Sequence, residues 1–196
     1  MKNKFFLLLL TTILLTGCAR NTTPQENINL SSSENNTSES SDSETQEPYV
    51  VTFTSTTIDG DAITDSVFAN SKLTMLNVWG TYCNPCLNEM PDLAEIATEY
   101  DSKEFQMFGI ICDVTTDAPT NDLVNAQDLI KATKATTYPH ILVNESLYYN
   151  LVGASDSVPT TYFINQNGEL LGYLVGAQSK ANWITIIDAL LAEAGE

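Results

Sequence analysis

Hydrophobic and polar positions follow two different spacings along this chain, and the spacing switches repeatedly from residue 49 onward. Runs rich in β-branched and aromatic residues predict strands, whereas apolar residues that recur every three or four positions predict helices. Strands are predicted within 49–58 and at 62–64, 73–79, 105–114, 140–143, 160–164 and 170–175. Helices are predicted at 65–69 with Asp65 as the cap, from the Cys83–Cys86 segment to about 100, and at 123–135, 147–152 and 180–194.

The order of these elements predicts the fold class. Strands alternate with helices at first, and a hairpin followed by a helix closes the chain, which is typical of an α/β domain with a mixed central sheet flanked by helices. The apolar run Leu73–Trp79 is typical of a strand covered on both faces. The Asp59-Gly60 turn before Ala62–Thr64 predicts an N-terminal β-hairpin extension. We expect this domain to span residues 48–196.

The first residues have the pattern of a targeting segment. Lys2 and Lys4 form a positively charged start, and the apolar stretch 5–15 that follows is too short to span a bilayer. The stretch ends in Leu-Thr-Gly-Cys, which resembles a bacterial lipobox with Cys18 as the lipidated residue. We therefore expect residues 1–17 to be a lipoprotein signal peptide. An ordinary secretory signal with an incidental cysteine is the alternative.

Composition separates a tether from the predicted domain. Residues 18–47 are rich in Ser, Asn and Glu and almost lack large apolar side chains, so we expect a lipidated Cys18 followed by a disordered tether. The whole chain carries 25 acidic and 8 basic residues, a formal net charge of -17. Such a chain repels nucleic acid and anionic lipid, so no nucleic-acid partner is expected.

Two thiols give the chain its candidate chemistry. Cys83 and Cys86 stand where a predicted strand is followed by a predicted helix, and a Cys pair of this spacing at such a junction indicates a redox site. The start of a helix favours an anion, so we expect the pKa of Cys83 to lie below that of a free thiol. The Cys83 thiolate would attack a substrate disulfide, and Cys86 would then attack Cys83 and release the reduced product.

Other uses of the Cys pair fit the sequence less well. A zinc site needs a second pair of ligands, and only Cys112 and His140 remain in the domain. A c-type haem needs His at the position of Leu87, and a peroxidase would carry Pro and Thr where this chain has Leu76 and Gly80. We expect no metal or other cofactor, an inert buried Cys112 and a structural or surface His140. A non-catalytic binding or metal-handling lipoprotein with a structural disulfide stays an open alternative.

The segment Trp79–Cys86, followed by Glu89-Met90-Pro91, resembles the active-site segment of TlpA/ResA-like thioredoxin-fold lipoproteins. The similarity continues through Tyr138-Pro139 and Val158–Ile164 to the final helix and covers roughly residues 49–195. It implies a thioredoxin-like fold and a thiol-disulfide oxidoreductase anchored at the outer face of a bacterial cell membrane. Tyr82 departs from the commoner Trp at its position.

The resemblance also implies roles for individual residues. Pro159 matches a cis-proline that faces the Cys pair and holds a substrate strand, and Val158 and Trp79 are expected to contact substrate as well. Glu89 matches an acid near the pair, and three residues after Cys86 it is placed to take the proton of that thiol. A first-turn acid that complements the helix dipole is the alternative role for Glu89. Asn77 stands where cytoplasmic thioredoxins carry a buried acid.

Partners are likewise implied by the resemblance. A reductant in an oxidising compartment must be recharged, which implies a membrane electron donor of the CcdA/DsbD type. Client protein disulfides of the apocytochrome c or methionine sulfoxide reductase type are expected, with the protein acting as a monomer. The sequence does not choose between these clients.

Overall fold

A computed structural model gives the structure of residues 47–193. The predicted signal peptide, the predicted lipidation site at Cys18 and nearly all of the predicted tether lie outside the described residues. Within 47–193, no helix combines the length and the apolar character that crossing a membrane requires.

The described chain contains every strand and helix that the sequence predicts. The strands are β1 (Thr54–Thr56), β2 (Ala62–Thr64), β3 (Leu73–Trp79), β4 (Phe105–Thr115), β5 (His140–Val143), β6 (Thr160–Asn165) and β7 (Leu170–Val175). The helices are α1 (Asn84–Glu99), α2 (Thr120–Ala132), α3 (Glu145–Asn150) and α4 (Lys180–Glu193), with 3-10 helices η1 (Asp65–Asn70) and η2 (Val152–Ala154). The bounds of β2, β3, β5 and β7 are those predicted.

Five of the strands form one mixed sheet. Their order is β5-β4-β3-β6-β7, and β1 and β2 form a separate antiparallel hairpin. Strand β3 lies at the centre, parallel to β4 and antiparallel to β6. All of its side chains are buried, as its continuous apolar run predicts. The predicted mixed sheet and the predicted N-terminal hairpin are therefore confirmed.

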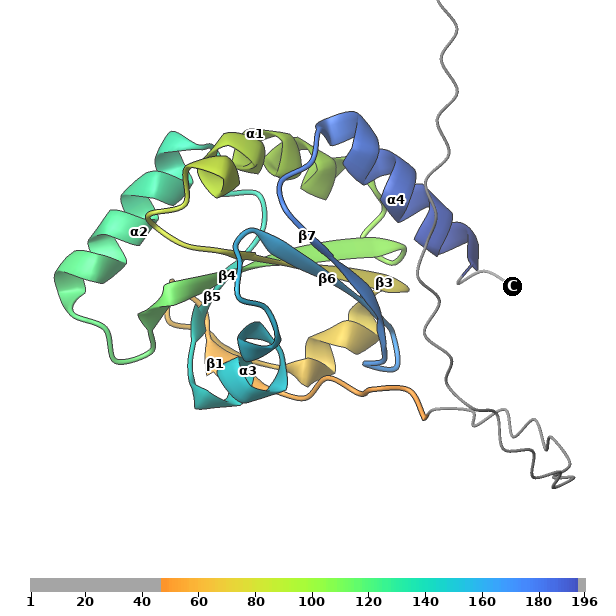
Figure 1. Ribbon diagram of the computed structural model, residues 1–196, viewed down its shortest axis with the longest axis horizontal. Coiled ribbons are helices and arrows are strands. Elements are labelled where there is room, and N and C mark those ends of the chain that lie inside the picture. Colours follow the sequence, from red (N-terminus) through yellow and green to blue (C-terminus); the bar gives the residue numbers. More distant parts are fainter. Residues whose placement is uncertain (1–46, 194–196) are drawn as a thin grey trace, which may run out of the picture. The chain divides into compact units, whose positions relative to one another are not determined.

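The sheet separates two apolar cores. In Figure 1, α1, α2 and α4 cover one face of the sheet, while β1 and α3 lie on the other side. Successive side chains of a strand point to opposite faces, so β3 contributes to both cores. Met75 and Trp79 enter the core beneath α1, and Leu76 and Val78 enter the core on the hairpin side.

Three helices differ in detail from their predictions, and one of them, α3, begins and ends two residues before the predicted 147–152. Helix α2 begins three residues early, because its first turn from Thr120 is mostly exposed and adds little to an apolar pattern. It ends before Lys134, whose φ of 59° lies in the left-handed region. The cap of η1 is Thr64 rather than the predicted Asp65, because the Thr64 side chain accepts a hydrogen bond from the backbone N–H of Ser66.

His140 ties the end of β3 to the interior. Trp79 Nε1 donates to His140 Nδ1 at 3.1 Å, and His140 Nε2 lies 2.8 Å from the carbonyl oxygen of Ala135. Because Nδ1 accepts, Nε2 carries the proton and donates to Ala135, and the ring is neutral. Gly109 leaves room for the ring, since a Cβ there would overlap His140 Nδ1. Of the two predicted alternatives, a structural or a surface histidine, His140 is the structural one.

Gly109→Ala should lower the free energy of unfolding by about 1–3 kcal/mol, the usual cost of adding a methyl group to a filled core. Gly172→Ala is the matched control, because a Cβ at Gly172 has no heavy atom within 4 Å. Chemical denaturation of both variants measures the difference. Equal stability of the two variants would contradict the close packing of His140 on Gly109.

Stability should also depend on pH through His140. Burial lowers the pKa of His140 to about 4, whereas the unfolded chain has a histidine pKa near 6.5. Between pH 4 and pH 6.5, His140 is protonated in the unfolded chain but not in the folded protein. The stability is therefore full above pH 6.5 and falls as the pH drops toward 4. The His140 contribution to this fall should be about 3 kcal/mol. Denaturation across this range should show a shallower fall for His140→Gln, and parallel profiles would contradict a buried neutral ring.

Candidate redox site

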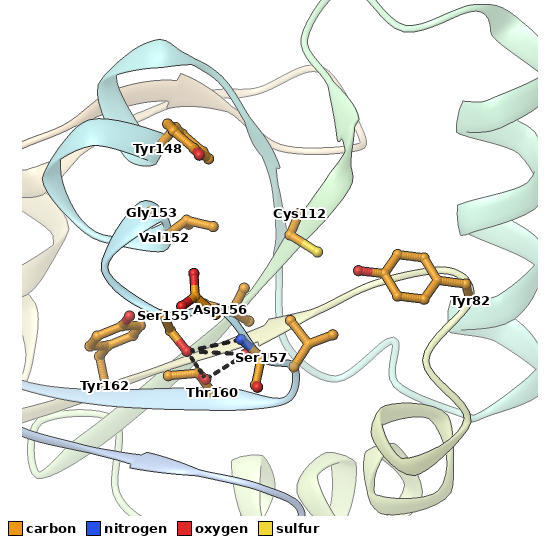
Figure 2. Close-up of a pocket in the computed structure, with 12 residues that line it drawn as sticks. Tyr82, Cys112, Tyr148, Val152, Gly153, Ser155, Asp156, Ser157, Thr160 and Tyr162 are labelled. Carbon is orange, nitrogen blue, oxygen red and sulfur yellow. Dashed lines mark hydrogen bonds between the residues drawn. The ribbon is translucent and has the colours of Figure 1, made fainter.

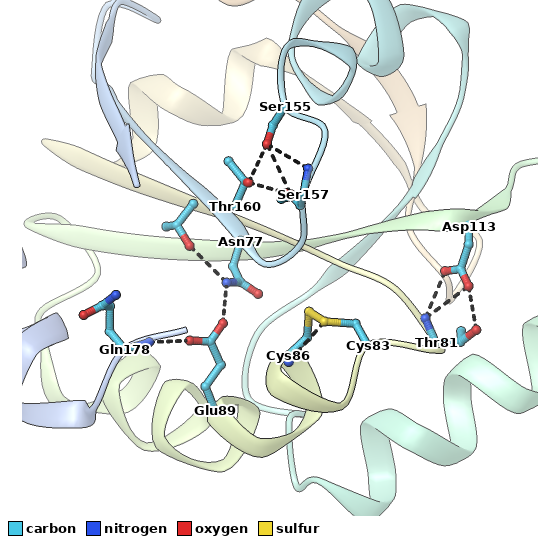
Figure 3. Close-up of a disulfide and its surroundings, with 11 residues drawn as sticks. Asn77, Thr81, Cys83, Cys86, Glu89, Asp113, Ser155, Ser157, Thr160 and Gln178 are labelled. Atoms are coloured by element: carbon cyan, nitrogen blue, oxygen red, sulfur yellow. Dashed lines mark hydrogen bonds between the residues drawn. A yellow bond between two sulfur atoms is a disulfide. The ribbon is translucent and has the colours of Figure 1, made fainter. Parts of the chain in front are cut away.

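Cys83 and Cys86 lie at the start of α1, directly after the loop that leaves β3 (Figure 3). The two residues form a disulfide, with Cα atoms 5.3 Å apart. Cys83 keeps 5% of its surface exposed, whereas Cys86 is fully buried. Of the two cysteines, only Cys83 therefore presents surface to an incoming thiol.

The sulfur of Cys83 caps helix α1. Cys83 is the N-cap residue, and its Sγ accepts a hydrogen bond from the backbone N–H of Cys86 at 3.2 Å. Pro85 fits the first turn, where the N–H that it lacks has no helical partner. The remaining unpaired N–H groups and the positive end of this 16-residue helix would surround a negative charge on the sulfur. The geometry therefore favours a thiolate on Cys83 in the reduced protein.

An acid on the neighbouring strand holds the loop before Cys83. Both carboxylate oxygens of Asp113 accept from the backbone N–H of Thr81, at 3.0 and 3.1 Å, and Oδ2 also accepts from the Thr81 hydroxyl at 2.6 Å. Asp113 lies near the end of β4, which is parallel to β3, so the two strands end at the same edge of the sheet. The sequence motifs did not single out Asp113 as a residue of the site. The available signal was an acid near the carboxyl end of an apolar parallel strand.

Glu89 is buried between α1 and the sheet, with 4% of its surface exposed. Its Oε1 accepts from Asn77 Nδ2 and its Oε2 from the backbone N–H of Gln178, both at 3.1 Å. Asn77 Nδ2 also donates to Thr161 Oγ1 at 3.0 Å, so the network joins β3, α1, β6 and the segment before α4. Burial raises the pKa of Glu89, and these hydrogen bonds offset the rise only in part. A buried carboxylate one turn from Cys86 is suited to accept a proton.

Unpaired polar atoms gather around Glu89. Among the described residues, the buried atoms without a hydrogen-bond partner are Asn77 Oδ1, Tyr138 Oη and Trp183 Nε1. The Trp183 indole N–H favours the ionised form of Glu89 without reaching full hydrogen-bond geometry. Burial, and to a smaller extent the charge of Glu89, raises the pKa of Tyr138. Because buried polar atoms are normally paired, these three atoms distinguish the surroundings of Glu89 from the rest of the described core.

The peptide bond between Val158 and Pro159 is cis, as the resemblance implies. Val158 packs against the core that contains both cysteines of the disulfide. Within residues 47–193, neither the backbone N–H nor the C=O of Val158 has a hydrogen-bond partner, whereas the Pro159 carbonyl accepts from Gly176 at 2.8 Å. The free groups of Val158 are available to an extended chain of another molecule. The substrate contacts of Val158 and Pro159 stay predictions.

Two residues lie in places that the sequence did not predict. Trp79 was expected to contact substrate, but its indole is fully buried and donates to His140. It supports the redox loop from within the core, so the predicted contact is wrong. Cys112 was expected to be buried, but it is only half-buried because it borders an open hollow beside Tyr82. Partial burial, with the charge of Asp113, raises the pKa of the Cys112 thiol, which disfavours a third redox thiolate.

The chain is similar in sequence to known proteins. The AhpC/TSA family profile matches residues 47–171, more than half of the chain. Thiol-disulfide oxidoreductase ResA of Oceanobacillus iheyensis is 33% identical over 106 residues, and ResA of Bacillus thuringiensis is 28% identical over 109. These matches cover 54% and 56% of this chain, and 50% and 58% of the two relatives. The chain thus spans little more than half the length of these curated relatives.

A solved structure extends the comparison to the fold. The thiol:disulfide interchange protein of Chlorobium tepidum, a thioredoxin family protein, matches with a TM-score of 0.61 and 26% identity, over 74% of this chain and 97% of that protein. The mixed sheet with flanking helices is thus the thioredoxin-like fold, and the resemblance to ResA-like proteins is confirmed. On the match over residues 47–171, this chain belongs to the AhpC/TSA family.

Proposed function

We propose that this protein is a thiol-disulfide oxidoreductase that reduces disulfides of client proteins. The observation that carries the proposal is the placement of the Cys83 sulfur at the N-terminus of α1, in a disulfide with Cys86. The names of the similar proteins, thiol-disulfide oxidoreductase and thiol:disulfide interchange protein, support the same activity.

The reaction proceeds through a mixed disulfide. In the reduced protein the Cys83 thiolate attacks one sulfur of the client disulfide, and the other client sulfur leaves as a thiolate. Glu89 takes the proton of the Cys86 thiol. The Cys86 thiolate then attacks Cys83 Sγ, which forms the Cys83–Cys86 disulfide and releases the second client sulfur. The client gains two electrons, and the protein loses two.

Val158 and Pro159 position the client. The free backbone N–H and C=O of Val158 pair with an extended client segment as an added strand would. Val158 lines the same hollow as Tyr82, the residue before Cys83, so this pairing brings a client cysteine near Cys83 Sγ.

The location and the partners of the protein rest on its sequence. In this proposal residues 1–17 are the signal peptide, Cys18 carries the lipid, and the tether of residues 18–47 reaches about 30 Å from the outer face of a bacterial membrane. A membrane electron donor of the CcdA/DsbD type restores the dithiol. The proposed clients are of the apocytochrome c or methionine sulfoxide reductase type, and the protein acts as a monomer.

Cys86→Ser should trap clients, because Cys83 can still attack while no thiol resolves the mixed disulfide. The full chain carrying this change, expressed in its native host, should form adducts that reductant dissolves and mass spectrometry identifies. The added change Cys112→Ser should leave the adducts in place, whereas Cys83→Ser should abolish them.

Adducts that survive Cys83→Ser would contradict the proposed nucleophile. A reactive Cys83 without any adduct would favour the alternative, a non-catalytic binding or metal-handling lipoprotein with a structural disulfide.

Glu89→Gln should slow the release of client from the mixed disulfide about 100-fold near neutral pH, because an amide cannot accept the Cys86 proton. Only ionised Glu89 acts as the base, so the wild-type rate should rise as the pH increases through the raised pKa of Glu89 and then level off. The variant should lack this rise. Stopped-flow measurement of client release gives the profiles, with Glu95→Gln on the exposed side of α1 as the control. Identical profiles for wild type and Glu89→Gln would exclude Glu89 as the base.

A further inference from the structure

Two hollows that share lining residues lie beside the redox loop, on the face of the sheet opposite α1, and Figure 2 shows the first of them. The first has a volume of about 490 Å³ and lies between Tyr82, η2 and the segment before β6. The second, of about 830 Å³, lies between the end of β4 and the start of α3. Cys112 and Tyr148 line both hollows. We call the two together the acidic groove, defined by Tyr82, Tyr148, Tyr149, Asp117, Glu145 and Asp156.

The aromatic walls of the acidic groove are open to solvent. Tyr82 is 69% exposed, Tyr148 52% and Tyr149 76%. Tyr148 and Tyr149 meet edge to face, with ring centroids 5.5 Å apart. Large exposed aromatic side chains grouped around a hollow are typical of a surface that binds a partner. Their flat faces suit an aliphatic chain that ends in a cation.

The charges in the acidic groove all have one sign. Asp156 lines the first hollow, and Asp117 and Glu145 line the second, while no lysine or arginine lines either. Residues 47–193 contain no arginine, and their lysines are Lys72, Lys103, Lys131, Lys134 and Lys180. The groove therefore contains carboxylates without a basic side chain among its lining residues.

Hydrogen bonds hold the Asp156 loop in place. The hydroxyls of Ser155 and Thr160 hydrogen-bond to each other at 2.7 Å, and Thr160 Oγ1 also donates to the carbonyl of Ser157 at 2.7 Å. These contacts anchor the residues on both sides of Asp156 to the start of β6, as Figure 2 shows. The carboxylate of Asp156 thus stands at the groove rim on an ordered loop.

The acidic groove begins at the redox site. Tyr82 directly precedes Cys83, and Val158, which also lines the first hollow, directly precedes Pro159. A client strand paired with Val158 advances about 3.3 Å per residue, with alternate side chains on the same face. Side chains within a few residues of the client cysteine therefore reach the groove.

We propose that the acidic groove binds a lysine or arginine side chain next to the reactive cysteine of the client. The inference rests on the proposed function and adds the class of substrate to it. The aliphatic stem of the client side chain packs between Tyr82 and Tyr148, and its cationic end meets Asp156. Clients with a basic residue close to the disulfide are then reduced faster than neutral or acidic ones.

Three disulfide peptides that differ at one position beside the cysteine test this inference. The position carries Lys, norleucine or Glu, and kcat/KM for reduction by the reduced full-length protein is measured with dithiothreitol present to recycle it. We expect the Lys peptide to be reduced about 5–30-fold faster than the norleucine peptide, and the Glu peptide to be slowest. Because the contact is electrostatic, 0.5 M salt should shrink the preference for Lys over Glu.

Variants of the protein show which residues cause the preference for the Lys peptide. Asp156→Asn should reduce the preference for the Lys peptide over the norleucine peptide at least threefold, because only the Lys peptide carries the cationic end that meets Asp156. Tyr148→Ala should slow the reduction of both peptides, because both have the aliphatic stem that packs on the ring. Asp122→Asn removes the same charge from an exposed site on α2 and should keep the preference. An equal loss in Asp122→Asn and Asp156→Asn would show that net charge alone draws the peptide, which would overturn the inference.

A binding measurement distinguishes failure of this inference from failure of the proposed function. Peptides with both cysteines replaced by Ser, labelled for fluorescence anisotropy, should bind the oxidised protein in the same order, with Lys tightest. Reduction of all three peptides at one rate, together with equal binding, would overturn the acidic groove and leave the oxidoreductase proposal intact. Tighter binding of the Lys peptide without reduction of any peptide would support the groove and overturn the oxidoreductase proposal.

Discussion

The sulfur of Cys83 caps the N-terminus of helix α1 by a hydrogen bond, and the arrangement of the site depends on this hydrogen bond. As N-cap, Cys83 Sγ accepts the N–H of Cys86 and lies where the unpaired groups of the helix favour negative charge. The same placement sets Cys86 one turn inside the helix, buried and within bonding distance of Cys83. One capping interaction thus defines the attacking cysteine, which is the partly exposed member of the pair, and the buried resolving cysteine.

The rest of the fold keeps this cap in place. The buried centre strand β3 ends at Trp79, which His140 anchors, and Asp113 fixes Thr81 in the loop that follows. On the other side of the cap, Glu89 is held by polar contacts from β3 and from the segment before α4. The apolar cores therefore make the surrounding fold rigid, and a few polar contacts fix the residues on either side of the disulfide.

The sequence predicted those features that depend on local pattern. The apolar run of β3, the Cys pair at a strand end and the hairpin turn near Gly60 each carry their own signal, and the resemblance added the cis bond at Pro159. Contacts between distant segments carry no such signal. The contact between Asp113 and Thr81 and the partial exposure of Cys112 depend on how the strands align. The prediction for Trp79 was wrong because an indole side chain can lie in a core as well as on a binding surface.

Thiol exchange under controlled redox conditions measures whether Cys83 and Cys86 act as a redox pair with Cys83 as the nucleophile. The full chain is equilibrated with mixtures of reduced and oxidised dithiothreitol and then alkylated, and peptide mass analysis reports the state of each cysteine. We expect the Cys83–Cys86 pair to convert reversibly between disulfide and dithiol, and brief alkylation of the reduced protein to modify Cys83 before Cys86 and Cys112. A disulfide that never opens, or a reduced protein in which Cys86 or Cys112 reacts first, would contradict this expectation.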